Sequence, residues 1–238
     1  MRLFQWTNGY FYAGEIIRGH EAKRNSCSYV DYLKIKSRNS CGGFLIQEYF
    51  VLITAHCLER IEVTLGAHNI EEQEDTQQVI CVQKAFPQQD YNPKTGINDI
   101  MLLKQEKKAK LPKAVQLLRL PKRKTQVKPG IPCQVAGWRK LAPEGRSSST
   151  LQEVETVVQE EEKCVDCFPE YYDPATEICV EDPKIKNTSF QGDSGCPLVC
   201  GNVVEGIMSY GLDNGATQRV LTKVSWFLRW IKKTMKQS

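Results

Sequence analysis

The chain has 238 residues, enough to bury a full hydrophobic core as one domain or as two small halves. Its hydrophobic fraction of 41% excludes bulk disorder, and 32 basic against 28 acidic residues give a net charge of +4, too small to indicate nucleic-acid binding by itself. No apolar run reaches the length of about 18 residues that a membrane-spanning helix needs. Composition therefore favours a globular protein and excludes a transmembrane one.

Ten cysteines are more than a cytosolic protein of this size usually carries. Only Cys164 and Cys167 stand at a close spacing, and the chain has three histidines, so disulfides in an oxidising compartment are favoured over a zinc site. Residues 1–13 begin with a basic residue and end in a small one, but polar residues interrupt the apolar core that a signal peptide needs. The cysteines predict export; the leader alone does not.

The predicted elements are short apolar segments, many of them rich in Val, Ile and Phe, separated by turn residues. In chain order they are residues 41–46, 49–54, 61–65, 78–82, 99–103, 133–138, 151–158, 197–199, 203–208 and 220–224. Helical periodicity is nearly absent until residues 226–235, which place Trp226, Phe227, Trp230 and Ile231 on one stripe. The sequence predicts an all-β protein of barrel or sandwich type with one C-terminal helix, divided into halves near residues 112–132.

The stretch QGDSGCPL at residues 191–198 places Ser194 between Asp193 and Gly195 ahead of a predicted strand. Serine among glycines can simply form a turn. It can also be a nucleophile, provided that a base, a group that orients the base and donors for an oxyanion lie close to it. The chain must supply those groups from elsewhere.

The base and its orienting acid have good candidates. His56 follows the apolar segment VLITA and precedes Cys57, where a cysteine can fix the loop. Asp99 leads into the apolar segment IMLL, and an acid at the start of a buried strand needs a hydrogen-bonding partner. Taken singly, His56 is as well explained as a core histidine, and Asp99 better explained as a turn residue.

Together, His56, Asp99 and Ser194 with their flanking residues resemble the trypsin-like (chymotrypsin) serine proteases, from residue 16 to the end of the chain. Further segments are similar to the granzyme and mast-cell protease branch, and to granzyme B in particular. They are GEIIRGHEAK at 14–23, VTLGAHNI at 63–70, NDIMLL at 98–103 and WIKKTMK at 230–236.

The resemblance implies two six-stranded antiparallel β-barrels with a C-terminal helix and an active site between the barrels. It implies that His56 is the general base, that Asp99 orients it, and that Ser194 is the nucleophile. The backbone N–H groups of Gly192 and Ser194 would form the oxyanion hole. No cofactor and no metal are expected.

The resemblance also implies activation by cleavage. Residues 1–15 would be a leader and propeptide ending in Gly-Glu, and residues 16–238 the peptidase domain. The freed amine of Ile16 would pair with Asp193, so activity is expected to fall in alkali as that amine loses its proton. The implied disulfides join Cys41 to Cys57, Cys133 to Cys200, and Cys164 to Cys179, which leaves Cys27, Cys81, Cys167 and Cys196 without a family partner.

By the same resemblance, the pocket for the side chain before the cleaved bond is lined by Thr188, Ser189, Phe190, Ser209, Tyr210 and Gly211. It has no acid at its base, which disfavours cleavage after Lys or Arg. Arg219 falls where granzyme B places a pocket arginine, and a guanidinium there favours Asp or Glu. An arginine turned to the surface, with a chymase-like preference for aromatic residues, is the alternative.

Three residues depart from the family pattern: Arg18, Arg139 and Cys196 each replace a glycine. They favour a second hypothesis, a catalytically weak homologue that acts as a binding protein through the basic face of its last helix, with acidic proteoglycan as partner. The intact triad argues against that hypothesis. The first expectation is therefore a monomeric serine endopeptidase acting on proteins and peptides, with a granzyme-like role, secreted or stored in secretory granules.

Overall fold

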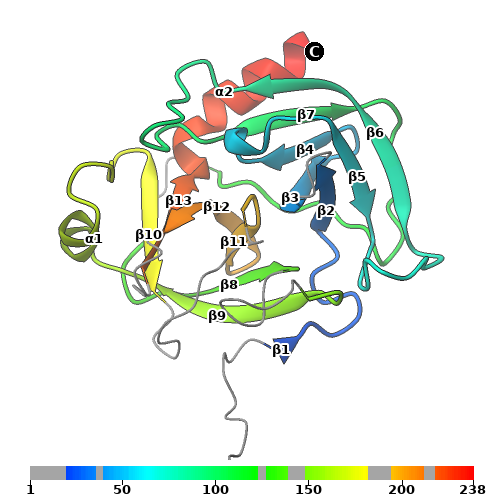
Figure 1. Cartoon of the computed structure of the whole chain (residues 1–238), viewed down its shortest axis with the longest axis horizontal. Coiled ribbons are helices and arrows are strands. Elements are labelled where there is room, and N and C mark those ends of the chain that lie inside the picture. The colour runs from blue at the N-terminus through cyan, green and yellow to red at the C-terminus, as the bar shows by residue number, and fades with distance from the viewer. Residues whose placement is uncertain (1–19, 36–39, 123–126, 139–147, 182–193, 212–217) are drawn as a thin grey trace, which may run out of the picture.

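The computed structural model describes residues 20–35, 40–122, 127–138, 148–181, 194–211 and 218–238. It contains two closed six-stranded antiparallel β-barrels and, in the described residues, two α-helices (Figure 1). This confirms the predicted all-β fold of chymotrypsin type with a C-terminal helix. None of the described helices is long and apolar enough to cross a membrane.

The first barrel closes in the order β2-β3-β4-β7-β6-β5. Its interior is filled by apolar side chains that alternate along the strands, as in β2, where Leu33 and Ile35 are buried on either side of exposed Lys34. The strands are β2 (Val30–Ile35), β3 (Ser40–Gln47), β4 (Phe50–Ile53), β5 (Ile61–Leu65), β6 (Gln78–Pro87) and β7 (Met101–Gln105).

The second barrel closes in the order β8-β9-β10-β13-β12-β11, and the short strand β1 (His20–Glu21) joins it at β9. Val135, Val154, Val180 and Leu198 belong to its buried core. The strands are β8 (Pro132–Gly137), β9 (Gln152–Val158), β10 (Glu177–Glu181), β11 (Pro197–Cys200), β12 (Val203–Gly211) and β13 (Gln218–Lys223).

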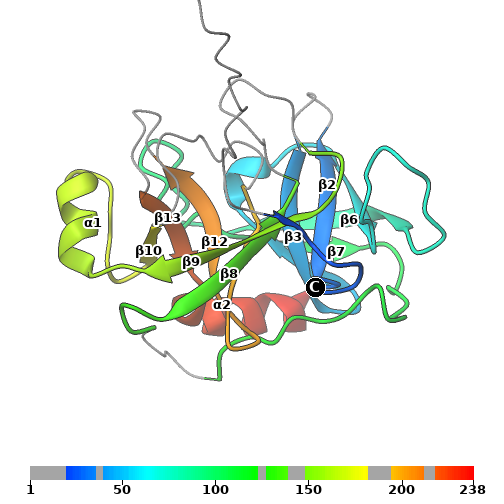
Figure 2. The ribbon, with the colours of Figure 1, turned by 90° about the horizontal axis from the view of Figure 1, so that it is seen from below.

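The C-terminal helix α2 (Val224–Gln237) crosses the outside of both barrels (Figure 2). Phe227 and Ile231 are buried in a cluster with Leu102 of the first barrel and Ile207 of the second. The predicted stripe was wrong for Trp226, whose exposed fraction is 42%. The helix begins at Val224, earlier than predicted, so its buried face includes Val224 and Leu228 instead.

The predicted strands agree with observed strands to within a few residues, but three observed strands were not predicted. They are the two-residue β1, β2, in which the polar Asp31 and Lys34 interrupt the apolar run, and β10, a five-residue strand that begins and ends with glutamate. The helix α1 (Glu161–Cys167), in which Cys164 is the buried residue, was not predicted either. A disulfide joins Cys164 of α1 to Cys179 of β10, which also pairs with β13 and β9.

Two further disulfides join Cys41 to Cys57 and Cys133 to Cys200, so the structure contains the same three pairs that the resemblance implies. The Cys41–Cys57 bridge ties β3 to the segment that carries His56. Outside these disulfides, Cys27 and Cys196 are buried, Cys167 is partly buried, and Cys81 is exposed on β6.

Candidate active site

His56 lies in a single turn of 3-10 helix, Ala55–Cys57, directly after the buried strand β4. Its neighbours Ala55 and Cys57 are buried, while a third of the His56 side chain is exposed, at 33%. The disulfide from Cys57 to β3 anchors this turn. The local fold therefore holds the backbone of His56 rigidly and leaves its imidazole open to solvent.

Asp99 is almost fully buried, with 1% of its surface exposed, and three donors surround its carboxylate. His56 donates from its backbone N–H to Oδ1 at 2.9 Å and from Nδ1 to Oδ2 at 2.6 Å. The Ser209 hydroxyl donates to Oδ2 at 2.5 Å. This set of donors replaces the water that a buried carboxylate loses, which offsets the cost of its burial.

The contact between Asp99 and His56 also fixes the tautomer of the imidazole. An ionised carboxylate can only accept hydrogen bonds, so Nδ1 carries the proton and Nε2 is left with its lone pair. The pair is thus arranged as a base that can take a proton at Nε2 and an acid that stabilises the resulting imidazolium.

Ser194 is partly buried and stands in the turn that leads into β11, in the second barrel. Its carbonyl oxygen accepts a hydrogen bond from the Gly42 N–H on β3 at 2.7 Å. The next residue, Gly195, has a φ of +83° and donates its N–H to Met208 of β12 at 2.9 Å. A Cβ at Gly195 would lie 2.2 Å from the Gly42 oxygen, so only glycine fits between the two barrels at this point.

These contacts connect Ser194 to His56 by a short route. Gly42, which binds the Ser194 carbonyl, follows Cys41, and Cys41 is bonded to Cys57 next to His56. The structure therefore brings the backbone of the predicted nucleophile to the strand that is covalently tied to the predicted base.

Cys196, one of the three departures from the family pattern, is fully buried at 0% exposure. An ideal Cβ built at Gly42 would lie only 2.3 Å from its sulfur. The thiol thus occupies the space above a glycine of the opposite barrel. Cys196 is accommodated within the packing, and its burial keeps the thiol away from solvent.

A cavity of about 370 Å³ opens beside this site. His56, Asp99 and Ser209 form one side, and Tyr210 stands next to them on β12. The other walls come from two loops that were not predicted to lie here; they contribute Tyr91, Pro93, Lys94, Thr95, Gly96, Phe168 and Tyr171. The turn residues around Asn92 and Gly96 mark a loop in the sequence, but no sequence signal shows which site that loop faces.

Arg219 is buried, with 5% of its surface exposed, and lies opposite Gly211 in the pairing of β13 with β12. Its Nη1 donates to the Gln218 carbonyl at 2.7 Å. A Cβ built at Gly211 would lie 2.5 Å from Cδ of Arg219, so the arginine side chain passes directly against this glycine. The guanidinium therefore belongs to the interior beside the Ser209–Gly211 segment and not to the surface.

Several predicted site residues lie outside the described residues. These are Ile16, Arg18, Arg139, Thr188, Ser189, Phe190, Gly192 and Asp193. The activation pair, one oxyanion donor and one wall of the specificity pocket thus stay predictions.

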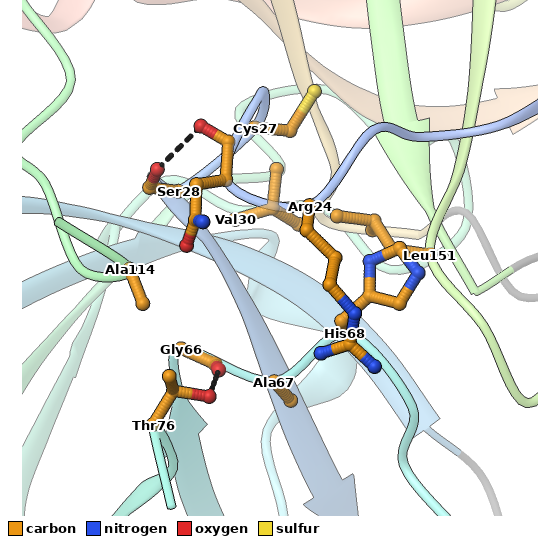
Figure 3. Close-up of a pocket in the computed structure, with 11 residues that line it drawn as sticks. Arg24, Cys27, Ser28, Val30, Gly66, Ala67, His68, Thr76, Ala114 and Leu151 are labelled. Atoms are coloured by element: carbon orange, nitrogen blue, oxygen red, sulfur yellow. Dashed lines mark hydrogen bonds between the residues drawn. The ribbon is translucent and has the colours of Figure 1, made fainter. Parts of the chain in front are cut away.

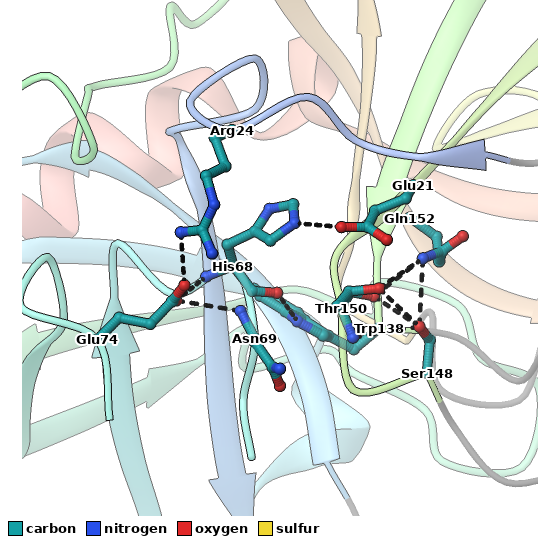
Figure 4. A network of polar contacts seen from close by, with 9 residues as sticks. All are labelled: Glu21, Arg24, His68, Asn69, Glu74, Trp138, Ser148, Thr150 and Gln152. Atoms are coloured by element: carbon teal, nitrogen blue, oxygen red, sulfur yellow. Dashed lines mark hydrogen bonds and ion pairs between the residues drawn. The ribbon is translucent and has the colours of Figure 1, made fainter. Parts of the chain in front are cut away.

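The other two histidines are engaged elsewhere. His20 pairs with Glu153, and His68 pairs with Glu21 through Nε2 at 2.8 Å (Figure 4). His68 also borders a second, smaller cavity of about 190 Å³, together with Arg24 and Cys27 (Figure 3). His56 is therefore the histidine that is placed to act as the catalytic base.

Cys41, His56 and Cys57 bring their ligand-type atoms within 4.8 Å of one another. Both sulfurs belong to one disulfide, so neither is the thiolate that a metal ion would bind. The cluster is explained by the anchoring of the His56 turn.

Comparisons with known proteins agree with this geometry. The model of the Trypsin family matches residues 16–231. The chain is 59% identical to granzyme B of Homo sapiens over 229 residues, covering 94% of this chain and 93% of that protein. It is 52% identical to mast cell protease 3 of Ovis aries, over 94% of this chain and 91% of that protein.

Among solved structures, that of GrC matches with a TM-score of 0.88 and 49% identity, covering 93% of this chain and 100% of the other. Human heparin binding protein matches with a TM-score of 0.84 and 28% identity, over 94% and 98% of the two chains.

Proposed function

The chain belongs to the trypsin family and is a granzyme B-like serine endopeptidase; from this premise we propose that it cleaves proteins after Asp or Glu, with His56, Asp99 and Ser194 as its catalytic triad. The observation that supports the triad is the buried Asp99 carboxylate, which accepts a hydrogen bond from Nδ1 of His56, a histidine whose side chain is partly exposed to solvent. The observation that carries the specificity is the buried Arg219 against Gly211.

The proposed reaction uses these residues in the following order. The Ser194 oxygen attacks the carbonyl carbon of the scissile bond while Nε2 of His56 takes the hydroxyl proton. The N–H groups of Gly192 and Ser194 stabilise the oxyanion, and His56 then gives its proton to the departing amine. Water attacks the acyl-enzyme in the same way, which returns the proton to Ser194 and releases the carboxylic acid. Asp99 stays ionised throughout and stabilises the imidazolium.

Activation is proposed to occur by release of the Ile16 amine, which would pair with Asp193. A new N-terminus there requires removal of residues 1–15, and the match of the family model from residue 16 onward agrees with that boundary. Arg18 and Arg139 would slow the rearrangement without touching the triad.

The proposed pocket selects an acidic side chain by charge. A guanidinium can donate two parallel hydrogen bonds to one carboxylate, and burial strengthens that interaction because water competes less. Arg219 is already held at its Nη1 by the Gln218 carbonyl, so its orientation costs little entropy on binding.

The test uses protein that begins at Ile16 and matched peptides that differ only in Asp, Glu, Phe or Lys before the cleaved bond. We expect cleavage after Asp, loss of all cleavage in Ser194→Ala, and a fall of at least about 100-fold in kcat/KM for the Asp peptide in Arg219→Ala, the loss typical of a charge-assisted pair. Arg119→Ala, at an exposed arginine, is the matched control and should leave kcat/KM unchanged.

Two results would contradict the proposal in different ways. A preference for Phe in the wild-type protein would keep the endopeptidase and remove Arg219 from the pocket. Absence of turnover with every peptide would instead favour the catalytically weak homologue, for which the described residues give no support, since the His56–Asp99 pair is intact.

A granzyme-like role and a secretory compartment are part of the same proposal. They are supported by the three disulfides, which persist in oxidising compartments, and by relatives named as granzymes and mast cell proteases. Binding of acidic proteoglycan by the exposed basic residues of α2, and the monomeric state, stay predictions.

A further inference from the structure

A buried acid lies behind the wall of the cavity beside His56. Glu177, the first residue of β10, has 1% of its surface exposed. Its Oε2 accepts hydrogen bonds from the Tyr210 hydroxyl at 3.2 Å and from the Asp173 N–H at 2.8 Å. Its Oε1 has no hydrogen-bonding partner in the part of the chain that the structure describes. No step of the triad mechanism uses this carboxyl group.

Tyr210 is held at its ring as well as at its hydroxyl. The ring of Phe168 meets it edge to face, with centroids 5.7 Å apart. On another side the ring lies so close to Gly96 that a Cβ there would stand 2.9 Å from two ring carbons. Among the described residues, Glu177 is the hydrogen-bonding partner of the Tyr210 hydroxyl, and packing fixes the rest of the side chain.

The position of Tyr210 bears on the substrate. Its neighbours are Ser209, which donates to Asp99, and Gly211, which packs on Arg219. In β12 these residues extend beyond the start of β11, because Pro197 pairs with Ile207, while their pairing with β13 continues to Gly211. One edge of this segment is therefore left open by the described strands, and an extended peptide can pair with it.

We propose that Glu177 is a positioning residue for substrate binding: its carboxylate holds the Tyr210 hydroxyl and thereby fixes the aromatic wall of the cavity beside His56. The residues of a peptide that precede the cleaved bond by two or more positions pack against that wall. The proposal rests on the proposed function, because it assigns the cavity to the substrate.

The charges around Glu177 make this anchor sensitive to pH. Burial raises the pKa of Glu177 to about 7; the Asp173 amide and the Tyr210 hydroxyl act to lower it, and the carboxylates of Asp173 and Asp99 add to the rise. Burial also raises the pKa of Tyr210, so its hydroxyl stays a donor throughout the neutral range.

Two more groups face the same region. The Lys223 ammonium, at the end of β13, donates to the Pro174 carbonyl, and burial lowers its pKa despite the nearby carboxylates of Glu161, Asp173 and Glu177. Burial and those acids raise the pKa of Tyr172, which keeps it neutral. The pKa of Glu177, about 7, places its own change of charge near neutral pH.

The direction of the effect follows. As the pH falls through about 7, Glu177 takes up a proton, and the charge-assisted bond from Tyr210 becomes a weaker bond between neutral groups. Tyr210 is then held less firmly, so the KM of peptides that reach the cavity rises. A substrate too short to reach the cavity is unaffected.

The first experiment compares KM between pH 6 and 8.5 for a peptide with four residues before the cleaved bond and for one with a single residue there. We expect the ratio of the two KM values to change about threefold to tenfold across this range in the wild type, the size of one charge-assisted hydrogen bond partly lost. In Glu177→Gln and in Tyr210→Phe the ratio should stay at its acidic value at every pH, because neither variant can form the charge-assisted hydrogen bond.

The double variant Glu177→Gln/Tyr210→Phe should be no worse than either single variant, because both remove the same bond. Glu205→Gln is the matched control. Glu205 lies on β12, the strand of Tyr210, is half-buried and has a pKa raised to about 7 by burial, but it does not line the cavity. It should leave the ratio and its pH dependence unchanged.

A second measurement does not depend on catalysis. In Ser194→Ala protein labelled with ¹³C at tyrosine, the Tyr210 resonance should titrate near pH 7, and this titration should disappear when Glu177→Gln is added. A pH-independent KM ratio in the wild type, or a Tyr210 titration that survives Glu177→Gln, would overturn the proposal. If peptidase activity is absent but Tyr210 titrates as expected, the proposed function is refuted, while the hydrogen bond between Glu177 and Tyr210 is confirmed.

Discussion

At the scale of single residues, Asp31 stands out because its carboxyl group is buried without compensation. It lies on β2 opposite Gly43, with 1% of its surface exposed, and neither carboxyl oxygen has a hydrogen-bonding partner among the described residues. Burial raises its pKa well above the ordinary range. The folded state therefore keeps this proton to a higher pH than the unfolded state does.

We predict that Asp31→Ala raises the free energy of unfolding at pH 7 by about 1–3 kcal/mol, the usual cost of a buried polar group that lacks a hydrogen bond. The sign follows from linkage: a raised pKa in the folded state costs stability as the pH rises above the ordinary pKa of an aspartate, and costs nothing below it. Chemical denaturation at pH 3.5 and 7 measures the difference. Asp75→Asn, at an exposed aspartate, serves as control. If Asp31→Ala is less stable than the wild type at pH 7, the Asp31 carboxyl group has a stabilising partner and the prediction is wrong.

At the scale of elements, the contact of β3 with the turn before β11 depends on two residues that fit only as a pair. The Cys196 sulfur fills the space over Gly42 that a side chain would otherwise take. A glycine at 196, which the family pattern has, would leave room there. The departure at Cys196 is therefore a local exchange of volume between two positions in contact.

This pairing predicts a specific non-additivity. Gly42→Ala should cost about 1–3 kcal/mol of unfolding free energy, as overpacking does, and Cys196→Gly combined with it should recover part of that loss. Thermal unfolding of the two single variants and the double variant measures the coupling. Gly130→Ala is the control for glycine replacement, because nothing lies within 4 Å of a Cβ built there, although its positive φ of +80° adds a strain of its own. Strict additivity of the two changes would contradict the packing described.

Elements were predictable where periodicity and flanking residues were strong, and less so where a tertiary contact decides. β5 was predicted at its exact bounds because Ile61, Val63 and Leu65 alternate with polar residues. The triad candidates could be predicted only together, because each flank is ambiguous by itself and the resemblance to serine proteases rests on all three. The bond between Glu177 and Tyr210 was not, because residues 33 positions apart meet only after β10 and β12 have both paired with β13.

At the scale of the whole molecule, a polar seam joins the two barrels on the side of His68. Glu74 accepts hydrogen bonds from the backbone N–H groups of His68 and Asn69 at 2.6 and 3.0 Å, and from Arg24 at 2.8 Å. The His68 carbonyl in turn accepts from the Trp138 indole of the second barrel at 3.1 Å (Figure 4). One carboxylate thus orders the loop through which the barrels meet.

We predict that Glu74→Gln lowers the stability of the protein at neutral pH and flattens its loss in acid. Burial acts to raise the pKa of Glu74, but the bonds from His68, Asn69 and Arg24 outweigh it and lower the pKa below its ordinary 4.5. The stabilisation is therefore complete above pH 4.5 and is lost as the pH falls below it. Unfolding free energies between pH 3 and 7 test this, with the exposed Glu71→Gln as control; an acid profile unchanged by Glu74→Gln would contradict it.

The disulfide of Cys41 with Cys57 keeps the proposed base within the first barrel, while the proposed nucleophile enters from the second barrel across a single backbone bond to Gly42. Neither half of the molecule holds a complete reaction centre. A newly synthesised chain that has formed one barrel, or has formed both without docking them, therefore lacks proteolytic activity toward itself and toward neighbouring proteins. Docking of the two barrels therefore limits proteolysis to molecules that have finished folding.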